Sequence, residues 1–113
     1  MKRLRADLWV SAFIRLHTQR GNMCVIRQRG DEIAGQIWIE VDHLDGSSSL
    51  YVPAMQLEPD SQERIFEVRF DHATYQDVNA RIQQEQAFDP DFWVISLETR
   101  DTDIGLNVSE SSA

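Results

Sequence analysis

The sequence predicts an α+β fold, namely a mainly antiparallel sheet of about five strands with an N-terminal helix and a second helix before the last strand. Three observations support this prediction. Two segments repeat apolar residues at helical spacing, several others alternate apolar and polar residues, and the run Phe92–Glu98 begins with apolar residues on both faces. Such a run is typical of a strand in the middle of a sheet. The predicted order is α-β-β-β-β-α-β, and short connections favour both helices on one face of the sheet.

The first predicted helix spans residues 4–20. Its apolar stripe consists of six residues at helical spacing: Leu4, Leu8, Trp9, Ala12, Phe13 and Leu16. Val10 and Ile14 extend this stripe beyond the width that one sheet face usually covers, so we expect them to contact the second helix or a second copy of the chain. Gly21 ends the helix, because glycine adopts the left-handed conformation at low cost. A short strand rich in β-branched residues follows at 23–27.

A hairpin is predicted next. Its first strand, residues 36–43, alternates apolar and polar residues. Asp45-Gly46 predicts a tight turn in which both central residues have positive φ. The second strand, residues 49–55, contains Pro53, which predicts a sheet edge or a bulge because proline donates no hydrogen bond to a neighbouring strand.

The remaining elements are a fourth strand, a helix and the last strand. Residues 64–70 alternate, with three apolar side chains expected to point inward: Phe66, Val68 and Phe70. Thr74 is the expected N-cap of a helix at 75–86, with Asp77 completing a sequence that resembles a capping box. These elements complete the predicted α+β order.

Length and composition predict one domain. We assign residues 1–104 to the domain and residues 105–113 to a flexible tail. Cys24 is the only cysteine, so the chain has no internal disulfide and a reducing compartment is expected. No segment approaches the roughly 18 apolar residues that a membrane span needs, and we expect a cytoplasmic protein that does not contact a membrane.

The net charge of −8 is unevenly distributed. The first 29 residues carry seven basic residues and one acidic residue, whereas the rest carry four basic and eighteen acidic residues. One explanation is an anion-binding face on the basic part. The favoured explanation is that the basic segments pack near acidic elements, within one fold or between two copies, because a strongly acidic molecule repels phosphate polymers at long range.

Three features together resemble a known family. They are a helix carrying Leu8-Trp9-Val10, a hairpin at Leu44–Tyr51, and Phe-Asp-Pro-Asp-Phe-Trp-Val at Phe88–Val94 followed by Glu98–Asp101. In these features the chain is similar to the small bacterial proteins catalogued as domain of unknown function 1491. The resemblance covers nearly the whole chain and implies a single cytoplasmic domain. It implies no activity, because the family has none established.

No pattern in the sequence indicates a catalytic, cofactor-binding or metal-binding site. Cys24 lies between apolar residues of a strand, where a thiol is usually an inert core group. The segment Asp101–Gly105 begins like a calcium loop but lacks the later glutamate ligand. Metal-ligand spacing is also absent from the three histidines: His17, His43 and His72. The sequence therefore predicts no cofactor and favours a protein that is not an enzyme.

The leading hypothesis is a non-enzymatic module that contacts another protein or forms a homo-oligomer. The alternatives are a nucleic-acid or phosphate-ligand binder that uses the basic N-terminal helix and first strand, and a small enzyme with an unrecognised site. Trp38 and Tyr51 are expected to pair across the hairpin, or to form an apolar patch if Trp38 faces solvent. The candidate interaction surface consists of Arg3, Arg5, Val10, Ile14, Arg15, Arg27, Arg29, Trp38 and Tyr51.

Overall fold

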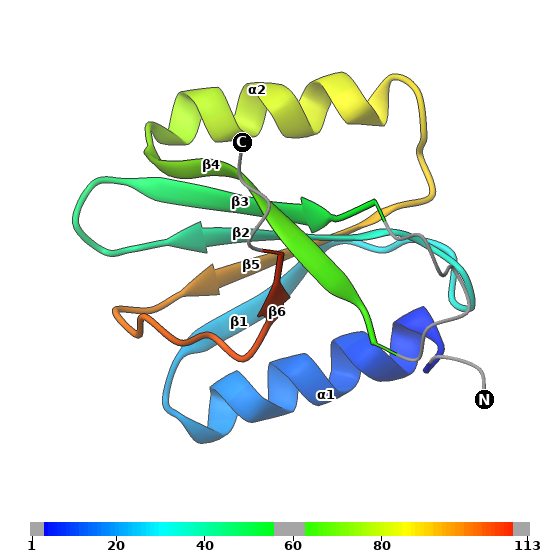
Figure 1. The fold of residues 1–113 in the computed structure, drawn as a ribbon, viewed down its shortest axis with the longest axis horizontal. Helices are drawn as coiled ribbons and strands as arrows, with labels where there is room; N and C mark the ends of the chain where they lie inside the picture. The colour runs from blue at the N-terminus through cyan, green and yellow to red at the C-terminus, as the bar shows by residue number, and fades with distance from the viewer. Residues whose placement is uncertain (1–3, 56–62, 110–113) are drawn as a thin grey trace.

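The computed structural model describes residues 4–55 and 63–109, and in this part of the chain a six-stranded sheet lies between two helices (Figure 1). The elements in chain order are α1 (Ala6–Gln19), β1 (Met23–Gln28), β2 (Ile37–Asp42), β3 (Ser48–Pro53), β4 (Ile65–Ala73), α2 (Tyr75–Gln86), β5 (Trp93–Glu98) and β6 (Asn107–Val108). The predicted α+β class is confirmed, as is the order of the first seven elements. No helix in the described ranges is long and apolar enough to cross a membrane.

The sheet is mixed, with the strand order β1-β5-β2-β3-β4-β6. The pairs β1–β5, β2–β3 and β3–β4 are antiparallel, whereas β2–β5 and β4–β6 are parallel. The additional strand is β6, which pairs with Ile65 and Phe66 of β4. Residues 107–108 were expected in the flexible tail and instead belong to the sheet, whereas residues 110–113 lie outside the described part.

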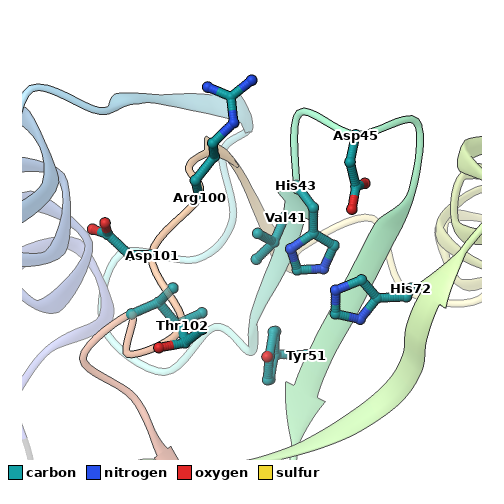
Figure 2. Close-up of a pocket in the computed structure, with 9 residues that line it drawn as sticks. Val41, His43, Asp45, Tyr51, His72, Arg100, Asp101 and Thr102 are labelled. Carbon is teal, nitrogen blue, oxygen red and sulfur yellow. The ribbon is translucent and has the colours of Figure 1, made fainter.

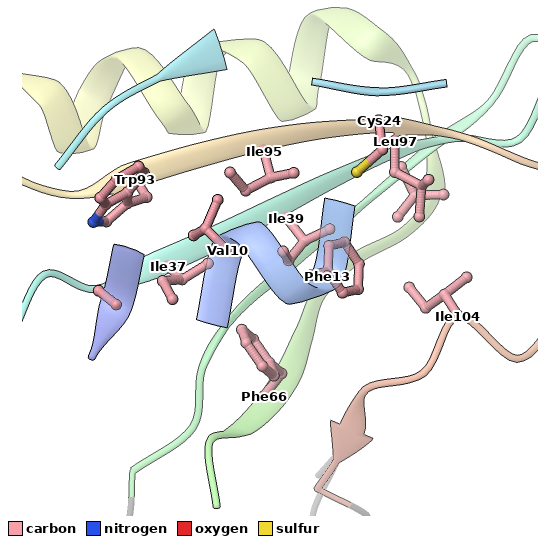
Figure 3. Close-up of a cluster of buried hydrophobic side chains, with 12 residues drawn as sticks. Val10, Phe13, Cys24, Ile37, Ile39, Phe66, Trp93, Ile95, Leu97 and Ile104 are labelled. Carbon is pink, nitrogen blue, oxygen red and sulfur yellow. The ribbon is translucent and has the colours of Figure 1, made fainter. Parts of the chain in front are cut away.

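The two helices cover opposite faces of the sheet, so the prediction that they share one face is wrong (Figure 1). The reason is that β5 is apolar on both sides and that β2 is buried on both sides, with Trp38 opposite Ile37 and Ile39. On the α1 side, Val10 and Phe13 pack against a cluster that contains Ile39 and Ile95 (Figure 3). The cluster on the α2 side contains Trp38, Leu50, Val52, Val78, Ile82, Phe92 and Val94. A strand apolar on both faces needs a cover on each side, and one helix supplies each cover.

The predicted central position of the last strand is confirmed. β5 lies between β1 and β2, and its side chains alternate between the two apolar clusters. Trp93, Val94, Ile95 and Leu97 are each 1% exposed or less. The apolar start of this strand therefore corresponds to burial on both faces.

β3 lies inside the sheet, so the predicted edge position at Pro53 is wrong. The pairing of β2 with β3 ends at Ile39 and Tyr51, two residues before Pro53. Only β4 continues beside the proline, where Phe66 is its partner. A proline is tolerated inside this sheet because the neighbouring strand β2 no longer pairs at that position.

β4 does not keep one face throughout its length. Its register to β3 shifts twice, between Ser48 and Leu50 and between Leu50 and Tyr51. As a result Phe66 packs in the cluster on the α1 side, whereas Phe70 packs against the cluster on the α2 side. The prediction that Phe66, Val68 and Phe70 share one inward face is wrong, because a bulge changes the alternation of side chains along a strand.

The predicted hairpin forms, but its turn differs from the prediction. The loop joins β2 to β3 across residues 43–47, and His43 N–H donates to the Ser47 carbonyl. The residues with positive φ are Leu44 and Gly46, rather than Asp45 and Gly46. A longer loop replaces the two-residue turn, and the carboxylate of Asp45 accepts hydrogen bonds from Ser47 within it.

The two helices differ in the groups that accept hydrogen bonds from the N–H groups of their first turns. At α1 the carbonyls of Ile33 and Glu32 accept from the N–H groups of Ala6 and Asp7, so the loop between β1 and β2 caps the helix. At α2 the predicted N-cap is confirmed, because the Thr74 hydroxyl accepts from the N–H of Asp77.

Candidate functional site

The arginines of the predicted interaction surface do not gather in one place. Arg5 pairs with Asp7 and Glu32 at the start of α1, and Arg27 contacts Glu40 under α2. Arg29 lies over the ring of Trp93, 5.0 Å from its centroid, and Arg15 is exposed on α1. Arg3 lies outside the described residues.

The apolar and aromatic members of that predicted surface are also separated. Val10 is 1% exposed and packs inside the core, and Ile14 is half-buried against the same cluster. Trp38 is 3% exposed and contacts Phe92 on the α2 side. Tyr51 is opposite Ile39 and packs on the α1 side, so the predicted Trp38–Tyr51 pair is wrong. β2 is buried on both faces, and the register therefore places the two rings on opposite sides of the sheet.

β1 is an open edge of the sheet. Among the described residues it pairs with β5 alone, and α2 packs on β3 and β4 and reaches the end of β1, where Asn79 and Gln86 contact Arg27 and Gln28. Met23 is 61% exposed and Val25 is 50% exposed, although Cys24 between them is buried. A strand edge presents unpaired N–H and C=O groups to other chains, and natural proteins usually protect it. Apolar side chains on such an edge mark it as a candidate contact surface.

A recess of about 370 Å³ lies beside the loop of the β2–β3 hairpin (Figure 2). Its walls come from β2, β3, the end of β4 and the segment after β5. The residues that line it are Val41, His43, Asp45, Tyr51, His72, Arg100, Asp101, Thr102 and Ile104. Tyr51 is the member of the predicted surface that reaches this recess.

His43 and His72 stack inside the recess. Their ring centroids are 3.8 Å apart and the ring planes differ by 5°. His43 Nε2 lies 2.7 Å from the Ser49 hydroxyl, which also accepts from the backbone N–H of His72 at 3.0 Å. His72 Nδ1 lies 2.7 Å from the carboxylate of Asp71. The ring lone pairs lie in nearly parallel planes, so the stacked pair cannot converge on one metal ion.

The recess perturbs the ionisation of its side chains. Burial lowers the pKa of His43, and the neighbouring His72 lowers it further, against the opposing effect of Asp45, Asp71 and Asp42. Burial raises the pKa of Tyr51, and the charge of Asp71 acts in the same direction. Both groups therefore favour their neutral forms more than they would in water.

Residues 101–104, after β5, are held to the end of α1 by hydrogen bonds from His17, Arg20 and Asn22. Asn22 donates its amide to Nδ1 of the buried His17, so Nε2 of that ring carries the hydrogen and donates to the Ile104 carbonyl at 2.9 Å. Asn22 also donates to Asp101, and this bond, together with those from Thr99 and Arg20, holds the pKa of Asp101 below its usual range. The calcium-like segment is thus a structural turn.

The side chains with nucleophilic chemistry are enclosed. Cys24 is 7% exposed, and burial raises the pKa of its thiol to about 11. Ser49 is fully buried although it contacts a histidine. Within residues 4–55 and 63–109, no three histidine, cysteine or carboxylate side chains gather closely enough to hold a metal ion. A substrate would have to displace packed structure to reach either nucleophile.

A sequence model of the family described as "Protein of unknown function (DUF1491)" matches residues 4–106. The chain belongs to the DUF1491 family. This match confirms the resemblance found in the helix, hairpin and Phe88–Val94 segments. A search of curated proteins found no match.

Solved structures of DUF1491 proteins and a related protein share the fold over almost the full chain. The solution structure of protein Atu0922 from A. tumefaciens is 32% identical, with a TM-score of 0.86 over 96% of this chain and 97% of that one. A crystal structure of a DUF1491 family protein from Caulobacter crescentus is 27% identical, with a TM-score of 0.79 over 95% and 98% of the two chains. An NMR structure of a DUF1491 protein from the same bacterium is 26% identical, with a TM-score of 0.81 over 97% and 100%. These bacterial relatives establish the fold and name no activity.

Sequence reasoning missed both candidate sites. The open edge depends on strand order, because β1 would be covered if a further strand lay beside it. The histidine stack depends on the hairpin loop and on the irregular end of β4, which together bring residues 43 and 72 into contact. The one available signal was the alternation of Met23, Cys24 and Val25, which predicts outward apolar side chains if only one face of β1 is covered.

Proposed function

We propose that this DUF1491 protein is a non-enzymatic interaction module that binds another polypeptide, either a different protein or a second copy, at the open edge of β1. The observation that carries the proposal is the exposure of Met23 and Val25 on a strand that pairs with β5 alone in the described chain. In β-strand addition, an extended segment bonds to the free backbone of an edge strand and places its side chains beside those of that strand.

The surroundings of β1 favour a polypeptide partner. On the α2 side, Met23 and Val25 stand opposite Glu98 and Ser96 of β5, where the helix does not cover the sheet. This position leaves an apolar strip beside an open backbone edge, with the charged end of Glu98 exposed next to it. A chain added here would gain main-chain hydrogen bonds and bury both apolar side chains.

The charged side chains support this function over nucleic-acid binding. Arg5, Arg20 and Arg27 each pair with a carboxylate, so these described arginines are neutralised within the fold. Arg15 and Arg29 are exposed and have no ion pair in the described part. Arg100, at the other end of the sheet from Arg29, is likewise exposed without an ion pair among the described residues, and such dispersed arginines on a chain of net charge −8 give a weak phosphate-binding surface. We place the protein in the cytoplasm, because its single cysteine is reduced and buried.

The proposal is tested by affinity capture from the native bacterial host with tagged protein at native expression level. The edge variant carries Met23→Lys and Val25→Lys, which adds two charges to the open edge. Ile33→Lys is the matched control, because Ile33 is 63% exposed in the loop between β1 and β2. Each preparation is also analysed by sedimentation velocity over a concentration series, which detects binding to a second copy.

The expected result is one stoichiometric protein partner, or a concentration-dependent dimer, that the edge variant loses and the Ile33→Lys control keeps. Retention of the same partner by the edge variant would contradict the proposal. Recovery of nucleic acid that is lost at high salt would transfer the function to the exposed arginines.

A further inference from the structure

Two histidine rings connect the β2–β3 hairpin to the end of β4. Figure 2 shows the rings of His43 and His72 next to one another in the recess. Their centroids are 3.8 Å apart and the rings are stacked. His72 has a φ of 52°, a left-handed conformation that a residue with a side chain rarely adopts. Such a conformation persists only where surrounding contacts hold it in place.

Ser49 links the same two residues from beneath. Its hydroxyl is fully buried, lies 2.7 Å from His43 Nε2 and accepts from the His72 backbone N–H. The hydroxyl hydrogen can rotate, so Ser49 can donate to an unprotonated Nε2 of His43 and can accept from a protonated one. The hydrogen bond therefore tolerates both charge states, and the contact that changes on protonation is the ring stack.

We propose that the His43–His72 stack is a proton-operated latch, which holds the hairpin to the end of β4 when the rings are neutral and releases them when both rings are protonated. The latch joins the hairpin to β4, whereas the proposed contact edge is β1 on the other side of β5, so the latch goes beyond the proposed interaction function. Release would widen the recess of about 370 Å³ beside Tyr51 and expose the buried hydroxyl of Ser49.

Charged groups from each surrounding element set the response of the latch. Asp71 precedes His72 on β4 and lies 2.7 Å from its Nδ1, so a proton on that ring has a counterion. Asp42 and Asp45 come from the hairpin, and the Asp45 carboxylate already accepts from the Ser47 hydroxyl and N–H. In the segment after β5, Arg100 adds a positive charge to the recess, and the carboxylate of Asp101 accepts hydrogen bonds from Arg20 and Asn22.

A positive charge on one of the two histidine rings opposes protonation of the other. The carboxylates on the hairpin and β4 favour a charged His43, but burial and the adjacent His72 act more strongly and lower its pKa. Two positive rings stacked at 3.8 Å repel one another, and separation of the rings relieves that repulsion. The left-handed conformation of His72 then loses one of the contacts that maintain it.

The test is an NMR titration of the histidine rings and the backbone amides in the full chain. His72→Asn is the informative variant, because asparagine tolerates positive φ and removes the second imidazole. Amide exchange of α1 and β5 is followed in the same samples, which separates local release from global unfolding.

In the wild type, we expect faster amide exchange at residues 43–49 and 71–73 as the pH falls through the His43 midpoint, with α1 and β5 unchanged. In His72→Asn, the His43 midpoint shifts upward and the pH dependence of that local exchange is lost. An unchanged His43 midpoint in the variant would overturn the latch. Local exchange that does not depend on pH in the wild type would also overturn it.

Discussion

The two edges of the sheet differ in regularity and in the side chains that they expose. At one edge, β1 has a regular register with β5 from Met23 to Ile26 and exposes Met23 and Val25. At the other, β4 changes register twice, is covered by the two-residue β6 only at Ile65 and Phe66, and contains the left-handed His72 near its end. Bulges, charged residues and short strands are features that prevent one sheet from pairing with another. The irregular edge is therefore protected, whereas the regular edge is available.

This difference assigns separate roles to the two edges. The interruptions in β4 bring His72 onto His43 at the wall of the recess. The regular part of β1 keeps its outward backbone aligned over four residues. Irregular backbone positions side chains for local polar contacts, while regular backbone provides the repeated hydrogen bonds that a second chain needs.

The largest predicted effect concerns the anchor of the β4 edge. Phe66 is 2% exposed, contacts Trp9 of α1 and pairs with Val108 of β6. We expect Phe66→Ala to destabilise the fold by about 3 to 5 kcal/mol, because it removes a buried ring and leaves a cavity. Urea unfolding measures the change. Val68→Ala, at a position 38% exposed on the same strand, should cost much less, and equal losses would show that β4 is not anchored by Phe66.

A smaller effect is expected where β1 ends. A Cβ on Gly30 would lie 2.5 Å from the Asp91 carbonyl oxygen and 2.6 Å from Cδ1 of Trp93. Gly30→Ala should destabilise the protein by about 1 to 3 kcal/mol, because backbone atoms of the neighbouring loop must move. Thermal unfolding checks this, with Ile33→Ala in the same loop as a control. A neutral Gly30→Ala would mean that the loop after β1 is not closely packed on β5.

The irregular edge should also respond to acid. Since the His43 pKa is below its usual range in the folded chain, the unfolded chain binds a proton at higher pH than the native chain does. The contribution of His43 to stability is therefore full above about pH 6.5 and decreases below it. His43→Gln should flatten this part of the stability profile in urea titrations at several pH values. An identical slope in the variant would exclude His43 as its source.

The smallest effect on stability is expected at the regular edge. Met23→Lys with Val25→Lys should change the free energy of unfolding by no more than about 0.5 kcal/mol per site, because both side chains are already exposed.

Cys24, between Met23 and Val25, should react slowly with iodoacetamide at neutral pH, since a thiol with a pKa of about 11 has very little thiolate. Rapid alkylation in the native state would show that β1 detaches from β5.

The sequence predicted the individual helices and strands better than it predicted which of them lie side by side. Two-sided apolarity at the start of β5 predicted a central strand, and Thr74 predicted the cap of α2, because both signals are local. The parallel pairing of β2 with β5 joins segments far apart in the chain, so no local pattern specified it. The prediction that both helices share one face failed because Trp38 of β2 and Val94 of β5 form a second apolar cluster with α2, opposite the cluster that contains Ile37 and Ile39. The histidine stack required two backbone irregularities, neither of which has a sequence signature here.

The most direct test of the account compares the two edges in living bacteria. A photo-cross-linking amino acid replaces Val25 on β1 in one strain and Val68 on β4 in another; these side chains are 50% and 38% exposed. The account predicts a discrete cross-linked protein, either a second copy or another chain, from position 25 and none from position 68. Equal cross-linking at both positions, or a product from position 68 alone, would contradict the assignment of the β1 edge as the contact surface.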